Sequence, residues 1–218
     1  MARGRPRGAE ATRRAILEAA VRGFAEKGFA ATSTREIAAL AGTNVASIAY
    51  HFGGKEGLRT ACAGHIVAVM GAVLEQAEAE DLPADPDAAR HMLTGLVRRF
   101  VAFLLLEPQA RPVAGFLLRE MAEPSAALDL IYERLFQHVH RRACTLWGVA
   151  TGGDPRSPAV RLAVFATIGQ IAYFNFARPV VERRMAWPGI GPAEAEAIAE
   201  AVIRNLEARL DADWKDRR

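Results

Sequence analysis

Apolar residues recur along the chain at intervals of three and four positions, and no long stretch alternates apolar with polar residues. The first spacing places apolar side chains on one face of an α-helix, whereas alternation is the signature of a half-buried strand. The pattern therefore predicts an all-α protein. Proline and glycine clusters divide it into helices expected at 9–27, 34–41, 45–51, 55–80, 87–107, 111–122, 125–149, 158–178 and 192–214, with room for a short helix near 180–186.

Local signals mark two of the expected helix starts. Ser33 is followed three positions later by Glu36, the spacing of a capping box in which each residue satisfies a backbone N–H of the other. Ser157 precedes Pro158, which combines an N-cap hydroxyl with a proline in the first turn. We therefore expect helices to start next to these pairs.

The two short helices at 34–41 and 45–51 need a longer neighbour, because isolated helices of this length are marginal in water. The helix at 9–27 provides one, since its apolar residues recur at helical spacing. Ile16, Leu17, Ala20 and Phe24 form a stripe on which we expect Ile37, Leu40, Ile48 and Phe52 to pack. Three helices joined through a tight turn at Gly42 describe a helix-turn-helix unit.

The outward face of the third helix is unusually slim. A helical wheel puts Ile48 and Phe52 on the packed side, Ala46, Ser47 and Tyr50 on the outward side, and Val45 and Ala49 at the edge. Small outward residues let a helix backbone approach the floor of a DNA major groove, which is about 12 Å wide. We therefore predict a contact with double-stranded DNA; the alternative is a short helix that only packs.

Charge is distributed unevenly along the chain. Residues 1–59 hold ten basic and five acidic side chains, net +5, and the remainder holds 18 basic and 20 acidic side chains, net −2. A basic N-terminal quarter on a neutral body is typical of a nucleic-acid contact. Arg3, Arg5 and Arg7 precede the first helix; they form either a solvated tail or an arm that enters a minor groove or follows phosphates.

The segment STREIAALAGTNVASIAYHFGGKEGL resembles the helix-turn-helix of the tetracycline-repressor (TetR) family of bacterial regulators, over roughly residues 10–60. The resemblance implies phosphate contacts from Thr34, Asn44, Tyr50, His51 and Lys55. It implies base-edge contacts from Val45, Ala46, Ser47 and Ala49. The chain departs from the family pattern at Ala49, where asparagine is usual, and at Gly54, where serine is usual, so the family's operator sequence is a poor guide.

Two later segments, FLLREMAEPSAALDLIYERLF and IAYFNFARPVVERR, resemble the C-terminal ligand-binding and dimerisation domain of the CecR/CerR-type branch. The implied organisation is a basic arm at 1–8, a DNA-binding domain at 9–56 and an effector-binding and dimerisation domain at 57–218. Residues 158–178 are apolar around most of a helix circumference, so with 192–214 they are expected to form half of a four-helix dimer interface. The alternative is a core helix in a monomer.

Effector contacts are predicted from polar and aromatic residues in this larger part: His65, Phe103, Arg119, Glu120, Tyr173 and Asn175. Each has an ordinary structural alternative, which for Arg119 and Glu120 is an internal ion pair or a solvated edge. For the other polar members the alternative is a core group with its hydrogen bonds satisfied.

Several functions find no support in the sequence. Cys62 and Cys144 are isolated, and His138 and His140 fall on different helix faces, so no metal site or cofactor is expected and a reduced cytoplasmic setting fits. No nucleophile elbow, phosphate loop or HExxH motif is present, which argues against an enzyme. The longest apolar segment, 162–177, is shorter than the ~20 residues of a membrane span.

The expectation is therefore a homodimeric transcriptional repressor that a small-molecule effector releases from a pseudo-palindromic operator. The alternatives are a helical ligand-binding protein without specific DNA function, or an enzyme.

Overall fold

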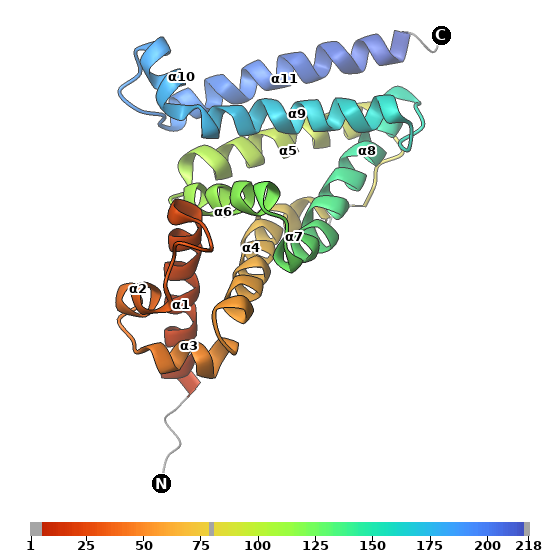
Figure 1. Cartoon of the computed structure of the whole chain (residues 1–218). Coiled ribbons are helices and arrows are strands. Elements are labelled where there is room, and N and C mark those ends of the chain that lie inside the picture. The colour runs from red at the N-terminus through yellow and green to blue at the C-terminus, as the bar shows by residue number, and fades with distance from the viewer. Residues whose placement is uncertain (1–5, 79–80, 216–218) are drawn as a thin grey trace. The chain divides into compact units, whose positions relative to one another are not determined.

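The computed structural model describes residues 6–78 and 81–215, and all regular structure in that part of the chain is helical (Figure 1). The all-α prediction is confirmed. The elements are α1 (Pro6–Lys27), α2 (Thr34–Leu40), α3 (Val45–Phe52), α4 (Lys55–Glu78), α5 (Pro86–Leu106), α6 (Ala110–Ala122), α7 (Ala126–Ile131), the π-helical turn η1 (Tyr132–Phe136), α8 (Gln137–Thr151), α9 (Pro158–Phe176), α10 (Arg178–Met185) and α11 (Pro192–Lys215).

Two expected boundaries are wrong. The first helix begins at Pro6 rather than at residue 9, as suits a residue that has no backbone N–H to leave unsatisfied. The single helix expected over 125–149 is α7 and α8 separated by the π-helical segment Tyr132–Phe136. A π-helical turn contains an extra residue relative to an α-helical one, so apolar periodicity alone did not reveal it.

Packing divides the chain into two compact units, which are described separately. The first contains the chain up to Val69 together with Arg111–Arg134, and the second contains Met70–Ala110 and the chain from Leu135 onward. The compact units therefore do not follow chain order, because residues 57–69 and 111–134 pack with the first three helices. The functional division at residue 56 stays a prediction.

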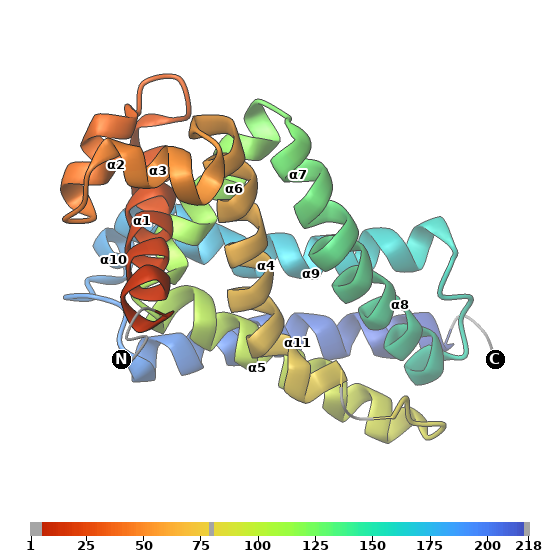
Figure 2. The same ribbon diagram turned by 90° about the horizontal axis from the view of Figure 1, so that it is seen from below.

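The core of the first unit surrounds α1, where Leu58 of α4 and Phe116 of α6 are buried, and Figures 1 and 2 show α2 and α3 beside α1. The expected stripe on α1 is buried, as are Ile37 and Ile48. Phe52 is only half-buried, and Leu40 is 71% exposed, so its predicted packing is wrong. Ile37 and Ala38 are the buried residues of α2, and Leu40 is its last residue.

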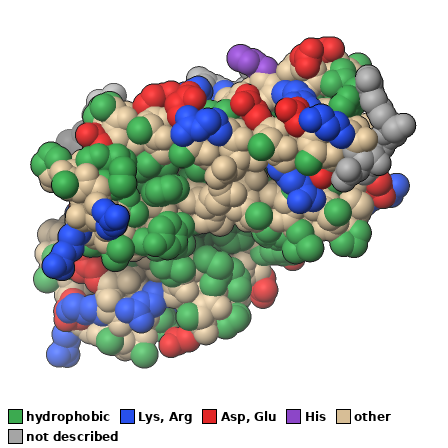
Figure 3. Space-filling model, turned by 90° about the horizontal axis from the view of Figure 1, so that it is seen from above, with side chains coloured by type: hydrophobic (Ala, Val, Ile, Leu, Met, Phe, Trp, Pro, Cys, Tyr) green, Lys and Arg blue, Asp and Glu red, His purple; other side chains and the backbone are tan. Residues whose placement is uncertain are grey.

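In the second unit α5, α8, α9 and α11 pack together. The inner face of α11 is buried along its length, whereas α9 buries only Val160, Val164 and Ile171. By length and composition α9 would also pass for a membrane span, of which 17% is buried. Its exposed side carries four large apolar residues: Leu162, Phe165, Tyr173 and Phe176. Figure 3 shows that hydrophobic side chains gather in patches on the face that it views.

Candidate nucleic-acid interface

Helix α3 is capped at both ends by the residues that flank it. Gly42 precedes it with a φ of 63°, a left-handed conformation that favours glycine. Asn44 is the N-cap, and its side-chain oxygen accepts the backbone N–H of Ser47 at 2.9 Å. Gly53 ends the helix at a φ of 72° and donates its N–H to the carbonyl of Ala49. The start and the end of α3 are therefore both defined by local capping.

The outward face of α3 is made of small residues with one large exception. Ala46 and Ala49 are exposed, Ile48 is buried, and Tyr50 is 84% exposed. Tyr50 is therefore the one large side chain on this face that stands out into solvent. The face therefore has the shape expected for insertion into a major groove.

Ser47 and Asn44 form a small hydrogen-bonded group with Thr43. The Ser47 hydroxyl donates to Asn44 Oδ1 at 3.1 Å and lies 2.9 Å from the hydroxyl of Thr43. Within the described part of the chain these bonds use only the oxygen of the Asn44 amide. Its NH₂ group takes part in none of these bonds.

The start of α4 is placed directly after α3 by two glycines. Gly54 has a φ of 118°, and Gly57 leaves no room for a side chain, because a Cβ there would lie 1.9 Å from the carbonyl oxygen of Phe52. Lys55 is the first residue of α4, so this helix end carries both free first-turn N–H groups and a basic side chain. A helix N-terminus with an adjacent cation favours an anion such as phosphate.

Lys55 contacts the connection between α1 and α2. Its Nζ atom lies 4.4 Å from the centroid of the Phe29 ring and 3.4 Å from the carbonyl oxygen of Ala30. The guanidinium of Arg59 lies 4.5 Å from the same ring centroid. Both are cation–π contacts. Neither Phe29 nor Arg59 was among the predicted site residues, although the spacing of Lys55 and Arg59 places both on one face of a helix.

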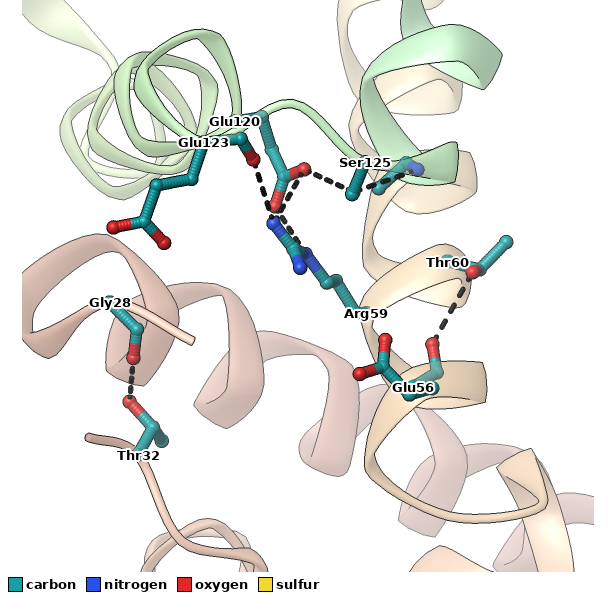
Figure 4. Close-up of polar contacts among 9 residues, drawn as sticks. Gly28, Thr32, Glu56, Arg59, Thr60, Glu120, Glu123 and Ser125 are labelled. Carbon is teal, nitrogen blue, oxygen red and sulfur yellow. Dashed lines mark hydrogen bonds and ion pairs between the residues drawn. The ribbon is translucent and has the colours of Figure 1, made fainter. Parts of the chain in front are cut away.

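Arg59 is bound by Glu120 of α6 and by Glu123, which follows the end of α6 (Figure 4). Its Nε donates to Glu120 Oε1 at 2.7 Å, and Nη2 donates to Glu120 Oε2 at 3.1 Å and to the carbonyl of Glu123 at 3.2 Å. The Ser125 hydroxyl donates to Glu120 Oε2 at 2.6 Å. The side chains of Arg59 and Glu120 are only 13% and 3% exposed. This is a buried, bidentate ion pair with both carboxylate oxygens satisfied.

The α1–α2 connection has further contacts with α1 and α6. The buried Thr32 hydroxyl lies 2.8 Å from the carbonyl oxygen of Gly28 (Figure 4), and Arg119 donates to the carbonyl of Glu26 at the end of α1, at 3.2 Å. A cavity of about 100 Å³ lies beside these groups and is lined in part by Phe29, Arg59 and Arg119. The Thr32 hydroxyl also lies 2.9 Å from the carbonyl oxygen of Gly23, which ties the end of this loop to α1.

The carboxyl group of Glu36 and the imidazole of His65, both in this unit, have displaced pKa values. Hydrogen bonds from the backbone of Ser33, and then from Lys27, lower the pKa of Glu36 from 4.5 to about 2. Both hydrogen bonds of the predicted capping box, from the Glu36 backbone to the Ser33 side chain and from the Ser33 backbone to the Glu36 side chain, are present, so the capping box is confirmed. Burial lowers the pKa of His65 from its ordinary value of 6.5, while the nearby Glu18 opposes that change.

The residues predicted to contact DNA differ in where they lie and in whether the structure describes them. Arg3 and Arg5 lie outside the described residues, and Arg7 lies in α1 with its side chain outside them. Thr34 is the first residue of α2 and is half-buried, as is His51, whose ring packs edge-on against Tyr50 at 5.0 Å. The remaining candidates lie on or beside α3 and at the start of α4, and all of these contacts stay predictions.

The predicted effector residues are not brought together within either unit. His65, Arg119 and Glu120 belong to the first unit and Phe103, Tyr173 and Asn175 to the second. Glu120 forms a buried ion pair with Arg59, which is the structural alternative that the sequence left open for it.

The three candidates of the second unit have ordinary surroundings. Phe103 is buried in the core, Tyr173 is more than half exposed, and the Asn175 amide donates to the carbonyl of Leu104 at 2.7 Å. No group of side chains suited to a metal ion occurs among the residues that the structure describes.

Comparison with known proteins identifies relatives along nearly the whole chain. The family model for bacterial regulatory proteins of the tetR family matches residues 16–62, and that for the C-terminal domain of the HTH-type transcriptional dual regulator CecR matches residues 89–212. The chain is 32% identical over 206 residues, 92% of each sequence, to the HTH-type transcriptional dual regulator CecR of Shigella flexneri.

Solved structures share the fold. A TetR-like transcriptional regulator from Rhodococcus sp. RHA1 matches with a TM-score of 0.68 and 21% identity, covering 92% of this chain and 96% of that one. AibR in complex with isovaleryl coenzyme A and operator DNA matches with a TM-score of 0.66 and 19% identity, covering 88% and 96%.

Proposed function

We propose that this chain, which belongs to the TetR family of bacterial regulatory proteins and to its CecR type, is a homodimeric repressor that a small molecule releases from a pseudo-palindromic operator. DNA-binding transcriptional regulation follows from family membership. The slim, doubly capped α3 beside the cationic start of α4 is the observation that supports specific DNA binding by this chain. A regulator of this kind works in the cytoplasm, has reduced cysteines and needs no catalytic site.

The exposed apolar side of α9 supports the homodimer. Phe165 is 59% exposed, and with Leu162, Tyr173 and Phe176 it forms a larger apolar surface than scattered surface residues account for. Two copies related by a twofold axis bury the same surface on each other. Such a dimer contains two copies of α3, one for each half-site of a pseudo-palindrome; half-sites of this kind lie about 34–36 Å apart, one turn of DNA.

Operator selection tests the function. We expect the full chain to enrich one pseudo-palindromic sequence from a random duplex pool and to bind it in preference to unrelated competitor DNA. The helical ligand-binding alternative predicts no enrichment. If no sequence is preferred, the DNA-binding proposal is wrong.

The dimer has its own test. Phe165→Glu places a charge in the proposed interface and should give a monomer by light scattering, with much weaker operator binding because two half-sites no longer bind together. Leu82→Glu is the matched control, since Leu82 is an exposed leucine of the second unit outside α9. A Phe165→Glu variant that remains dimeric would place the interface elsewhere.

Effector release is tested by calorimetry with and without operator DNA. Coupling between two sites is reciprocal, so an inducer must bind more weakly to the DNA complex than to free protein by the same factor by which it weakens DNA binding. Isovaleryl coenzyme A, the ligand in the AibR complex, is a first probe in a panel of small organic molecules. Equal affinities with and without DNA would exclude that compound as the inducer.

A further inference from the structure

We propose that Arg59 and Phe29 are positioning residues for DNA binding, which rests on the proposed function. Glu120 orients Arg59, Arg59 holds the Phe29 ring, and the ring holds the Lys55 ammonium at the place where it meets a phosphate. Helix α6 thereby controls a DNA contact through three successive side-chain contacts. All of these residues belong to the first compact unit.

The first contact leaves Arg59 one orientation. Three of its N–H groups have acceptors, two on Glu120 and one on the carbonyl of Glu123, at 2.7–3.2 Å. Because the guanidinium is planar, two parallel bonds to one carboxylate determine the direction of the whole group. Ser125 in turn fixes Glu120, to which it donates at 2.6 Å.

The second contact joins two cations through one ring. The Arg59 guanidinium lies 4.5 Å and the Lys55 ammonium 4.4 Å from the Phe29 centroid. Like charges four positions apart on a helix repel each other. Glu120 offsets the Arg59 charge, so Lys55 is able to approach the same ring. If Glu120 loses its charge, the repulsion from Arg59 acts on Lys55 directly.

The third contact sets where Lys55 points. Its ammonium lies near the carbonyl of Ala30 as well as the Phe29 ring, so the α1–α2 connection holds a long side chain that otherwise samples many rotamers. A cation held in advance loses less entropy when it meets a phosphate. Displacement of Phe29 therefore reduces DNA affinity without removing any group that touches DNA.

The experiment uses the full chain and a duplex that the parent protein enriches from a random pool, with affinity measured by fluorescence anisotropy at several salt concentrations. Lys55→Gln should lower the salt slope by about one, as expected for one lost phosphate contact. Glu120→Gln should weaken binding by about 3- to 30-fold and lower the slope in the same direction. In the Glu120→Gln background, Lys55→Gln should then cost little more.

Substitution of Phe29 separates positioning from folding. Phe29→Leu keeps apolar volume at a half-buried site but removes the ring face, so it should mimic Glu120→Gln. Phe29→Tyr keeps the ring face and should bind as the parent does. Arg98→Gln is the control, because it removes an arginine paired with Glu196 and Glu200 in the second unit and should leave DNA binding unchanged.

Additive losses in the Glu120→Gln and Lys55→Gln cycle would overturn the positional link, and so would parent-like binding by Phe29→Leu. A purely structural role would lower the melting temperature and leave the salt slope as it is. Failure of the proposed function is distinguishable, because in that case the parent chain itself enriches no sequence and both proposals fall.

Discussion

The buried ion pair between Arg59 and Glu120 allows a quantitative prediction about stability. Arg59→Met keeps most of the aliphatic stem and removes the guanidinium, and Glu120→Leu removes the carboxylate at similar volume. Removing one partner of a buried pair typically costs 3–5 kcal/mol, whereas replacing both by apolar residues is often neutral or stabilising. The two single variants and the double variant form a thermodynamic cycle.

The surroundings of each charge set the expected size of the effect. In Arg59→Met the Glu120 carboxylate, 3% exposed, keeps only the Ser125 hydroxyl among its side-chain donors, so we expect the loss to lie near 3–5 kcal/mol. In Glu120→Leu the guanidinium is more accessible, at 13%, and keeps the carbonyl of Glu123. We expect about 2–3 kcal/mol there, and less than about 1 kcal/mol in the double variant.

The assay has to report on the first unit. All three tryptophans, Trp147, Trp187 and Trp214, lie in the second unit, so intrinsic fluorescence follows the wrong part of the chain. Hydrogen exchange of α4 and α6 peptides across a urea series measures the required free energy of opening. Urea is preferable to guanidinium chloride, because a salt screens the ion pair.

A matched control fixes the meaning of the result. Arg98 of α5 also pairs with glutamates, but at 42–59% exposure of the partners, so Arg98→Met, followed by hydrogen exchange of α5 peptides, should change stability by no more than about 1 kcal/mol. If the two single losses simply add in the double variant, Arg59 and Glu120 do not interact energetically and the reasoning from their geometry is wrong.

Three further predictions concern the same unit. Glu36, with its pKa lowered to about 2, contributes stability that is present above pH 4.5 and lost as pH falls toward 2, so Glu36→Gln should flatten the acid limb of a stability profile; an unchanged limb would contradict this. Burial lowers the pKa of His65, so the protein should lose stability as pH falls below about 6.5, where the unfolded chain binds the proton more readily. His65→Gln should abolish that dependence in melting experiments. Gly57→Ala should destabilise the protein by about 1–3 kcal/mol, because the added Cβ meets the Phe52 carbonyl. The control is Gly64→Ala, at an exposed site of the same helix with open space around it, which should stabilise the protein by up to about 1 kcal/mol. Equal effects of the two variants in urea unfolding would refute the steric argument.

Features that depend on residues within one or two helical turns were predictable from the sequence. The helical period identified almost every element, and the Ser33–Glu36 capping box and the Ser157 N-cap formed as expected. The slim face of α3 was predictable for the same reason, since a wheel needs only the helix itself. Hydrogen bonds across three or four positions operate in any fold that keeps the segment helical.

Only the tertiary structure decided which distant residues meet. Arg59 and Glu120 are separated by 61 positions, and nothing in either segment names the other as its partner. Leu40 satisfied the apolar pattern and is nevertheless exposed at the last position of α2. The support of Lys55 by Phe29 likewise depends on where a loop residue comes to rest after α1 ends. Apolar burial is non-directional and constrains only the total area removed from water, so the choice among equivalent partners belongs to the packed chain as a whole.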